Sequence, residues 1–301
     1  MEDKSILRKV AKLILAQYAL NIKSIQYFTE ETNLFFKVID GNEKKYALKI
    51  FQEESSKIED NLAEVFFMDA VNKASNVPIP DIVHSINGDG VVVAKSKYTP
   101  LPKRAILYEW IEGEVFCGKE SYRLFRKMGK TIAKMHTATK DISIPENLNP
   151  KKWDKVFYYR GEVPVYKKPE FKNVVSDEFI KTMDYIIPVL DNELNNLYEN
   201  SNPQLIHADL NPWNILIDGD ELKIIDFEEA LLGLPVHDIS VFLYYYKYSD
   251  KFDYSLVKNS LLEGYSEIIN DNDFNEFYID LLMTARRVNF MNYVLDINHD
   301  D

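Results

Sequence analysis

The sequence predicts an α+β fold with two lobes, a small N-lobe with an antiparallel sheet plus a helix and a large, mainly helical C-lobe. Two observations support this class. Apolar residues alternate with a period of two through much of the first third, and from residue 113 onward they recur at helical spacing. We therefore expect residues 1–110 to form the N-lobe and residues 111–301 the C-lobe, with a hinge near residues 108–113.

The N-lobe is predicted to begin with a helix and to continue as a hairpin. Residues 5–20 carry apolar side chains at helical spacing. Within residues 22–51, the segments NLFFKVID and KKYALKIF flank the turn DGN, which is a strong hairpin pattern. A second helix is expected over residues 56–74, with Ser55 or Ser56 as its N-cap, and it ends at NVPIP because proline cannot continue a helix.

The remaining elements follow from the same periodicities. Short strands come first, and the helical second half is interrupted by two β-segments that flank a tight turn. We place strands at residues 82–86, 90–95, 105–110, 215–218 and 221–226, and helices at residues 120–138 and 177–199, followed by a helical remainder.

Composition and charge exclude several classes of protein. Hydrophobic residues make up 46% of the 301 residues, enough to bury a sizeable core. The formal net charge of -12 argues against nucleic acid as a partner, and a single cysteine rules out an intramolecular disulfide and fits a reducing compartment. No apolar run approaches the length of a membrane span, and the N-terminus does not resemble a signal peptide. We therefore expect a cytoplasmic protein with no membrane partner.

Residues 205–230, LIHADLNPWNILIDGDELKIIDFEEA, carry the most informative pattern. An apolar lead delivers Asp209, Asn214 follows five residues later, and a tight hairpin ends at Asp226. Phosphoryl transfer to an alcohol needs a carboxylate near the attacking hydroxyl and oxygen ligands that hold Mg²⁺ on the nucleotide phosphates. The pattern therefore indicates Asp209 as the catalytic base and Asn214 and Asp226 as metal ligands. A surface loop in which Asp209 and Asn214 only stabilise turns is the alternative.

Lys49 is the second candidate. It lies in the predicted strand YALKIF between apolar residues, where a lysine must either reach solvent or meet an anion. With the downstream loop present, we expect it to bind nucleotide phosphates and to pair with Glu64 of the next helix, or alternatively with Glu59. An edge-strand lysine that only improves solubility is the other interpretation.

The segments HADLNPWN and IIDFEEA resemble the two catalytic signatures of kinases. With YALKIF, LYEWIEGEVF, MGKTIAKMHTAT and LPVHDIS, they make residues 20–245 similar to the aminoglycoside phosphotransferase and choline kinase branch of the protein-kinase-like superfamily. The resemblance implies a protein-kinase-like fold, ATP or GTP as phosphate donor and Mg²⁺ as cofactor. It also implies that His207 is structural and that Asp238 braces the catalytic loop.

The resemblance further implies how the nucleotide is held. The purine would bond to the hinge backbone around Glu109 and Ile111. The first hairpin turn, TEETN, lacks glycine, so backbone amides and Thr32 or Asn33 would contact phosphate there. The two glutamates of that turn are unfavourable beside a triphosphate unless they point away.

A second departure from the kinase pattern bears on the type of kinase. Glu228 stands where the usual signature has a glycine, which removes backbone freedom that a mobile activation segment needs. This favours a small-molecule kinase. An atypical stress-response-type protein Ser/Thr kinase and a non-catalytic pseudokinase that acts as a binding module are the alternatives, although a complete set of catalytic residues argues against the pseudokinase.

The acceptor is expected to be a small molecule with a hydroxyl group, such as an aminoglycoside, an amino alcohol or a sugar-like compound. Acidic residues near the C-terminus would suit a cationic acceptor or form only a solvated surface. They include Asp271, Asp273, Glu276 and Asp280. Arg286 and Arg287 could pair with those acids or bind an anionic substrate.

Two aromatic groups remain. The first could contact the acceptor or pack in the core; it comprises Trp153, Phe157, Tyr158, Tyr159 and Tyr166. The second is an aromatic run that we expect in the core; it comprises Phe242, Tyr244, Tyr245, Tyr246 and Tyr248.

Overall fold

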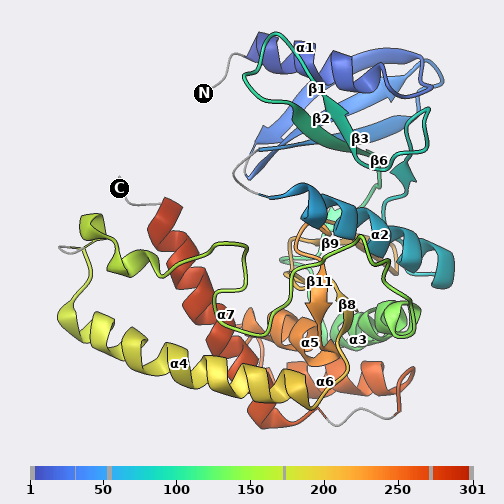
Figure 1. Ribbon diagram of the computed structural model, residues 1–301. Helices are drawn as coiled ribbons and strands as arrows, with labels where there is room; N and C mark the ends of the chain where they lie inside the picture. Colours follow the sequence, from blue (N-terminus) through green and yellow to red (C-terminus); the bar gives the residue numbers. More distant parts are fainter. Residues whose placement is uncertain (1–3, 31, 53–55, 172–173, 271–273, 298–301) are drawn as a thin grey trace. The chain divides into compact units, whose positions relative to one another are not determined.

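The computed structural model describes residues 4–30, 32–52, 56–171, 174–270 and 274–297 (Figure 1). An antiparallel sheet with helices comes first and a mainly helical part follows, which confirms the predicted α+β class. The chain folds as two compact units. The first unit is drawn from residues 1–114, 143–149 and 216–228, and the second from residues 115–142, 150–215 and 229–301.

A six-stranded sheet forms the centre of the first unit. Its strands pair in the order β1-β2-β3-β6-β4, and β5 also pairs with β6. Their bounds are Ile22–Glu30 (β1), Asn33–Asp40 (β2), Lys45–Phe51 (β3), Ile82–Val83 (β4), Val92–Ala94 (β5) and Lys103–Glu109 (β6). The β2–β3 hairpin is the one predicted, and its turn is fixed by Asp40, whose carboxylate accepts from the N–H groups of Asn42 (2.8 Å) and Lys44 (2.9 Å).

Successive side chains of β3 point to opposite faces of the sheet, and the two faces are buried against different helices. Leu48 and Ile50 point into an apolar core that α1 (Lys4–Leu15) completes, and Figure 1 shows α1 lying against the sheet. Lys49, between them, must therefore point to the opposite face, where α2 (Ile58–Ala74) lies. The strand pattern thus sends a lysine into the interior, where an ammonium group is stable only beside anions.

Two helix boundaries differ from the prediction. α1 ends at Leu15 rather than at residue 20, because the chain turns there while Tyr18 still packs in the same core and prolongs the apolar spacing. The N-cap of α2 is Lys57, whose N–H donates to the carboxylate of Asp60, and not Ser56. The alternative cap, Ser55, lies outside the described residues.

The strands predicted at 82–86 and 90–95 are also shorter than expected. Both pair with β6 rather than with each other. The hydroxyl oxygen of Ser85 accepts from the N–H groups of Asn87 (3.2 Å) and Asp89 (3.1 Å), which draws the chain into a tight turn between them. Side-chain bonds of this kind compete with strand pairing.

The predicted hairpin after the catalytic pattern is present. Its strands are β9 (Ile215–Asp218) and β10 (Glu221–Ile224), in a sheet of order β10-β9-β7 with β7 (Glu114–Val115). Gly219 turns the hairpin with a φ of 59°, a value that favours glycine. The strand β10 therefore delivers Asp226 two residues after its end.

Helices dominate the second unit. They are α3 (Tyr122–Thr139), α4 (Asp177–Glu199), α5 (Pro235–Tyr244), α6 (Tyr254–Ser266) and α7 (Glu276–Ile297), with the short helices η1 (Val165–Lys167) and η2 (Pro169–Phe171) and a two-stranded sheet of β8 (Gln204–Ile206) and β11 (Leu231–Gly233). The helix predicted at 177–199 has the observed bounds, and Ser176 caps it by accepting from the N–H of Phe179. None of the described helices has the length and apolar character needed to span a membrane.

Two glycines set the packing of α3 against α6. A Cβ atom on Gly129 would overlap the backbone carbonyl of Leu261, and one on Gly264 would overlap that of Arg126. The two helices can therefore cross this closely only because each presents a glycine to the other.

The aromatic groups divide between core and surface. Trp153, Tyr158 and Tyr166 are buried, which favours the core interpretation for these residues. In the run 242–248 the expectation was partly wrong. Phe242 and Tyr246 are buried, but Tyr244 and Tyr245 are partly exposed and Tyr248 is 75% exposed.

Candidate active site

The HADLNPWN loop of the second unit is fixed by Asp238. This residue lies in the first turn of α5, is fully buried, and accepts from the N–H groups of His207 (3.1 Å) and Ala208 (2.7 Å). Burial alone would raise the pKa of Asp238, but the hydrogen bond from His136, the electrostatic interaction with His136 and His207, and the bond from the Ala208 N–H outweigh it and lower the pKa. The ionised carboxylate thus braces the loop as the resemblance implied.

The contacts of Asp238 hold the backbone of this loop in a strained conformation. Ala208, immediately before Asp209, has a φ of 64°, a left-handed conformation that costs a residue with a Cβ about 1–2 kcal/mol. His207 is fully buried, and its Nδ1 accepts from the N–H of Asp209 (3.2 Å). These contacts agree with a structural role for His207 and leave Asp209 as the loop residue whose carboxylate is presented.

Both carboxylate oxygens of Asp209 are engaged in the second unit. Oδ2 accepts from the side-chain amides of Asn211 (2.8 Å) and Asn214 (3.0 Å). Oδ1 accepts from Nη2 of Arg286 on α7 (2.5 Å). The sequence pattern predicts that Asp209 and Asn214 lie close together. In the structure they do, and Asn211 and Arg286 also contact Asp209.

Asn214 is oriented by the same loop. Its Nδ2 donates to the backbone carbonyl of Asp209 (3.0 Å) as well as to the carboxylate, so its amide oxygen faces away from Asp209. An amide oxygen presented in this way is a donor of the type that Mg²⁺ prefers. Asn211 sets the loop's turn, because its Oδ1 accepts from the N–H groups of Trp213 and Asn214.

Arg286 is the contact that the sequence left undecided. Among the residues that the structure describes, it pairs with Asp209 and not with the acidic residues near the C-terminus, and Nη2 also donates to the hydroxyl of Tyr245 (3.1 Å). Burial would lower the pKa of Arg286, but Asp209 and Tyr245 outweigh it and raise the pKa, so the guanidinium stays charged. Arg287 is exposed and lies over the ring of Tyr248 (5.2 Å).

In the first unit, Lys49 forms the centre of a cluster of carboxylates. The side chain is 1% exposed, and Nζ lies 3.3 Å from Glu64, 2.9 Å from Glu228 and 3.8 Å from Asp226. The ion pair expected with Glu64 is therefore present, and Glu59 is not the partner. Burial would lower the pKa of Lys49, but Glu228, Glu64 and Asp226 raise it above its ordinary value, so the ammonium is charged.

Glu64 is buried as deeply as the lysine. Burial raises the pKa of Glu64, an effect that Lys49 and a hydrogen bond from Tyr108 partly oppose. The Tyr108 hydroxyl on β6 donates to Oε1 over 2.5 Å. Helix α2 and strand β6 therefore position the glutamate, and the glutamate positions the lysine.

Asp226 and Glu228 reach the cluster from the residues after β10. Asp226 has a φ of 63°, and its side chain is 37% exposed. Phe227, between them, is buried against Phe67 of α2 at 5.4 Å between ring centroids. The buried phenylalanine anchors the segment and leaves Asp226 partly accessible on the same unit as Lys49.

Glu228 also accepts hydrogen bonds from the glycine-free turn between β1 and β2. The Thr32 hydroxyl donates to Oε1 (3.2 Å), and the buried Asn33 donates its amide to Oε2 (2.5 Å). Tyr27 and Gln52 donate to the carboxylate of Glu30, while Glu31 lies outside the described residues. In the sequence Glu228 stands out only as a residue in place of glycine, although a carboxylate two residues after Asp226 is itself a signal of a charged site.

The predicted hinge follows β6. The N–H of Glu109 donates to the carbonyl of Asp81 (2.8 Å), and its carboxylate pairs with Lys44. Trp110 donates to the carbonyl of Lys45 (3.0 Å), and Ile111 is partly exposed. The backbone here is held by neighbouring strands of the first unit.

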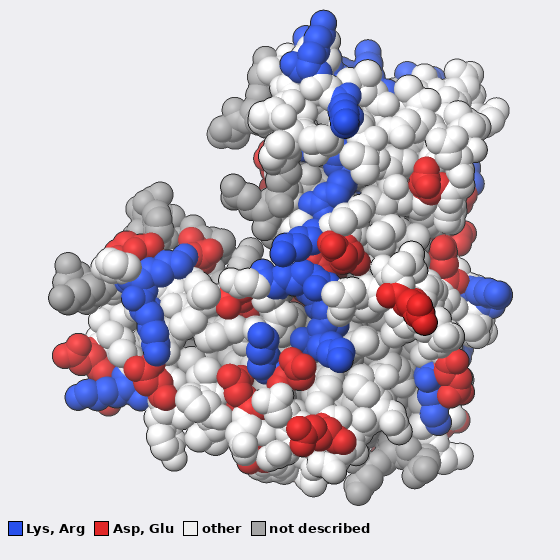
Figure 2. Space-filling view, viewed as in Figure 1, with Lys and Arg blue, Asp and Glu red and all other residues white. Residues whose placement is uncertain are grey.

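The acidic residues near the C-terminus are neutralised where they are described. Glu276 pairs with Lys258 and Asp280 with Lys247 (2.8 Å), while Asp271 and Asp273 lie outside the described residues. On the face shown in Figure 2, acidic and basic side chains are interspersed. These contacts favour the interpretation of a solvated surface.

A buried lysine–glutamate pair, a partly exposed aspartate after a hairpin and a braced HADLNPWN loop define a phosphotransferase of kinase-like architecture. The comparison with protein families agrees. Residues 25–268 match the model of the phosphotransferase enzyme family, so the chain belongs to this family. It is an enzyme that uses an alcohol group as phosphate acceptor.

Solved structures share the fold. An amicoumacin kinase in complex with AMP-PNP and Ca²⁺ matches with a TM-score of 0.74 at 17% identity, over 98% of this chain and 86% of that chain. A microcompartment-associated aminopropanol kinase gives 0.74 at 18% identity, over 95% and 89%. A Plasmodium vivax ethanolamine kinase gives 0.62 at 17% identity, over 100% and 85%. No curated protein matches the sequence significantly.

Proposed function

We propose that this protein transfers the γ-phosphate of ATP or GTP, with Mg²⁺, to a hydroxyl group of a small molecule. The observation that carries the proposal is the cluster of Lys49 with Glu64, Asp226 and Glu228. A fully buried ammonium held by three carboxylates is costly to maintain in a protein that has no use for it. Such a group becomes useful where a polyphosphate has to be bound.

The first unit would bind the nucleotide. Lys49, oriented by Glu64, would contact the phosphates, and Glu228 is the carboxylate that a phosphate would replace. The Thr32 hydroxyl and the Asn33 side-chain amide, which donate to Glu228 in this structure, would then donate to phosphate instead. The purine would bond to the backbone at Glu109 and Ile111.

Asn214 and Asp226 would hold the divalent ion, because an amide oxygen and a carboxylate oxygen are donors that suit Mg²⁺. When bound, the ion would neutralise charge on the phosphates. Asp209 would orient the acceptor hydroxyl and accept its proton at the carboxylate. The bonds from Asn211 and Asn214 hold the carboxylate for that task.

An aminoglycoside, an amino alcohol or a sugar-like compound is proposed as the acceptor class. The named functions of the structural relatives support this range, since they include kinases of amicoumacin, of aminopropanol and of ethanolamine. The protein kinase and pseudokinase alternatives gain no support of their own from the described contacts.

The test is transfer of labelled γ-phosphate to a panel of hydroxyl compounds by the wild type and by Asp209→Asn. The variant keeps the shape of the side chain but cannot accept a proton, so we expect turnover to fall by about 10²–10⁴-fold with nucleotide affinity retained in calorimetry. Wild-type turnover by the variant would contradict the assignment. Label found in protein rather than in small molecules would favour a protein kinase, and no stabilisation by Mg·ATP or Mg·GTP in a thermal-shift assay would favour a pseudokinase.

A further inference from the structure

Arg286 uses only one of its three guanidinium nitrogens. Nη2 donates to Asp209 (2.5 Å) and to Tyr245 (3.1 Å). Nε is buried and has no hydrogen-bond partner, and within the described part of the chain Nη1 makes no hydrogen bond or ion pair either. A guanidinium carries five N–H donors, so most of the donors of this charged group remain unused beside the catalytic carboxylate.

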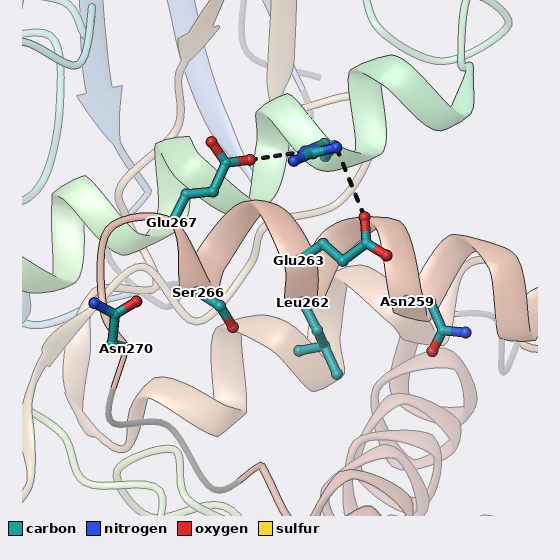
Figure 3. Close-up of a pocket in the computed structure, with 7 residues that line it drawn as sticks. Asn259, Leu262, Glu263, Ser266, Glu267 and Asn270 are labelled. Carbon is teal, nitrogen blue, oxygen red and sulfur yellow. Dashed lines mark hydrogen bonds and ion pairs between the residues drawn. The ribbon is translucent and has the colours of Figure 1, made fainter.

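Other arginines of the protein are used differently. Arg126 lines the pocket shown in Figure 3 together with Glu263 and Glu267. Its Nε donates to Glu267 (2.7 Å) and its Nη1 lies 3.8 Å from Glu263. Arg104 donates through Nη1 to Asn61 (2.6 Å) and through Nη2 to the carbonyl of Ser56 (2.5 Å). Each of these side chains spreads its donors over two acceptors on different nitrogens, whereas Arg286 does not.

The contacts of Asp209 fix where an acceptor hydroxyl can bind. A carboxylate oxygen offers two lone pairs. Those of Oδ2 are taken by Asn211 and Asn214, whereas Oδ1 accepts a single bond, from Arg286. The open lone pair therefore belongs to the oxygen that Arg286 touches. A hydroxyl bonded there lies next to the guanidinium, within about two hydrogen-bond lengths of Nη2.

We propose that the acceptor carries an anionic group, a carboxylate or a phosphate, a few bonds from its reactive hydroxyl, and that Arg286 binds this group. This inference rests on the proposed function, because it uses Asp209 as the residue that receives the hydroxyl. The unused donors at Nη1, which unlike Nε is not among the buried atoms, would satisfy the anion, and the planar guanidinium suits such groups geometrically. A purely cationic acceptor would instead bring like charge to a guanidinium that remains charged. Within the range proposed above, a sugar-like compound with an acidic group is therefore favoured over an aminoglycoside or a simple amino alcohol.

A matched series of acceptors tests the charge preference. Glycerol, glycerate, glycerol 3-phosphate and 3-amino-1,2-propanediol share a three-carbon hydroxyl frame and differ in the charge of one end group. We expect kcat/KM with Mg·ATP to be about 10- to 100-fold higher for an anionic member than for glycerol, the value of a hydrogen bond to a charged group. The comparison of glycerate with glycerol 3-phosphate separates a carboxylate site from a phosphate site.

Variants distinguish binding from positioning. Arg286→Gln should remove the preference by raising KM for the anionic acceptor, with the KM for ATP unchanged. Arg287→Gln is the matched control, because it removes an exposed arginine at the next position and should change neither value. If Arg286 only positions Asp209, Arg286→Gln will lower kcat equally for all four acceptors, and the inference is overturned.

A binding measurement tests, without turnover, whether Arg286 binds an anionic group of the acceptor. Saturation-transfer NMR with Mg·AMP-PNP should detect glycerate or glycerol 3-phosphate more strongly than glycerol on the wild type, and equally weakly on Arg286→Gln. Equal binding of the charged and neutral compounds to the wild type would overturn the inference. Efficient transfer to 3-amino-1,2-propanediol or glycerol alone would overturn it while the proposed function stands, whereas no transfer to any hydroxyl compound would overturn the proposed function itself.

Discussion

Replacing Lys49 with methionine removes the ammonium group from a cluster of three carboxylates. Methionine has a similar length and no charge, so the substitution changes electrostatics more than packing. Glu64 is 2% exposed and loses the charge that lies 3.3 Å away. Glu228 and Asp226 lose the same partner but are partly exposed, and solvent screens them more.

The magnitude can be worked from these distances. Two unit charges 3.3 Å apart attract each other by about 5 kcal/mol at an effective dielectric constant of about 20. Part of this offsets the cost of burying both groups, and removing one partner of a buried pair destabilises proteins by about 3–5 kcal/mol. We expect Lys49→Met to lower the free energy of unfolding by about 3 kcal/mol.

Urea unfolding of a double-mutant cycle measures this coupling. Glu64→Gln in the Lys49→Met background removes the stranded carboxylate and should recover part of the lost stability, which gives a coupling energy of about 2 kcal/mol. The loss in Lys49→Met should also shrink at acidic pH, because Glu64 then takes up a proton. Additive effects of the two substitutions, or a neutral Lys49→Met, would refute the reasoning.

Three further predictions test the supporting structure. Gly264→Ala should lower the free energy of unfolding by more than about 2 kcal/mol, because the new Cβ meets the backbone of α3, whereas the exposed Asn259→Ala in the same helix should change it by less than about 0.5 kcal/mol in urea unfolding. Burial lowers the pKa of His237 from 6.5 to about 4, so between these pH values the unfolded chain binds a proton that the folded chain does not bind. Stability should therefore fall as the pH drops from 6.5 towards 4, by up to about 3 kcal/mol, and His237→Gln should flatten this dependence; an unchanged slope would contradict the assignment. Asp238→Asn should lower the free energy of unfolding by about 2–3 kcal/mol and should lower kcat, because an amide cannot accept from both N–H groups and His136 as a carboxylate does. Unchanged unfolding and turnover would contradict the bracing role of Asp238.

Local chemistry decided which parts of the fold could be predicted. The helix 177–199 follows from helical periodicity, and the structure shows that its start coincides with Ser176 and the acidic residues after it, a standard helix start. The β2–β3 hairpin followed from alternation and the Asp40 turn. In contrast, α1 was extended too far because Tyr18 packs in the same core after the helix has ended, and periodicity records burial rather than hydrogen bonding.

The candidate site also has contacts that could be predicted from the sequence and contacts that could not. The pairing of Lys49 with Glu64 could be predicted because a strand lysine between apolar residues needs a buried anion, and α2 offers one. The contact of Arg286 with Asp209 joins residues 77 positions apart, and no spacing rule links α7 to the catalytic loop. The role of Glu228 was hidden because its partners, Thr32 and Asn33, lie on a turn nearly two hundred positions earlier.

The most direct test of the proposed function is Mn²⁺ binding, measured by electron paramagnetic resonance with AMP-PNP present. If Asn214 and Asp226 hold one ion on the nucleotide, Asn214→Ala and Asp226→Asn should each weaken Mn²⁺ binding by at least about tenfold. Asp218→Asn, an exposed carboxylate of the same hairpin that pairs with Lys223, should leave it unchanged. Retention of wild-type Mn²⁺ affinity by either Asn214→Ala or Asp226→Asn would contradict the shared metal site.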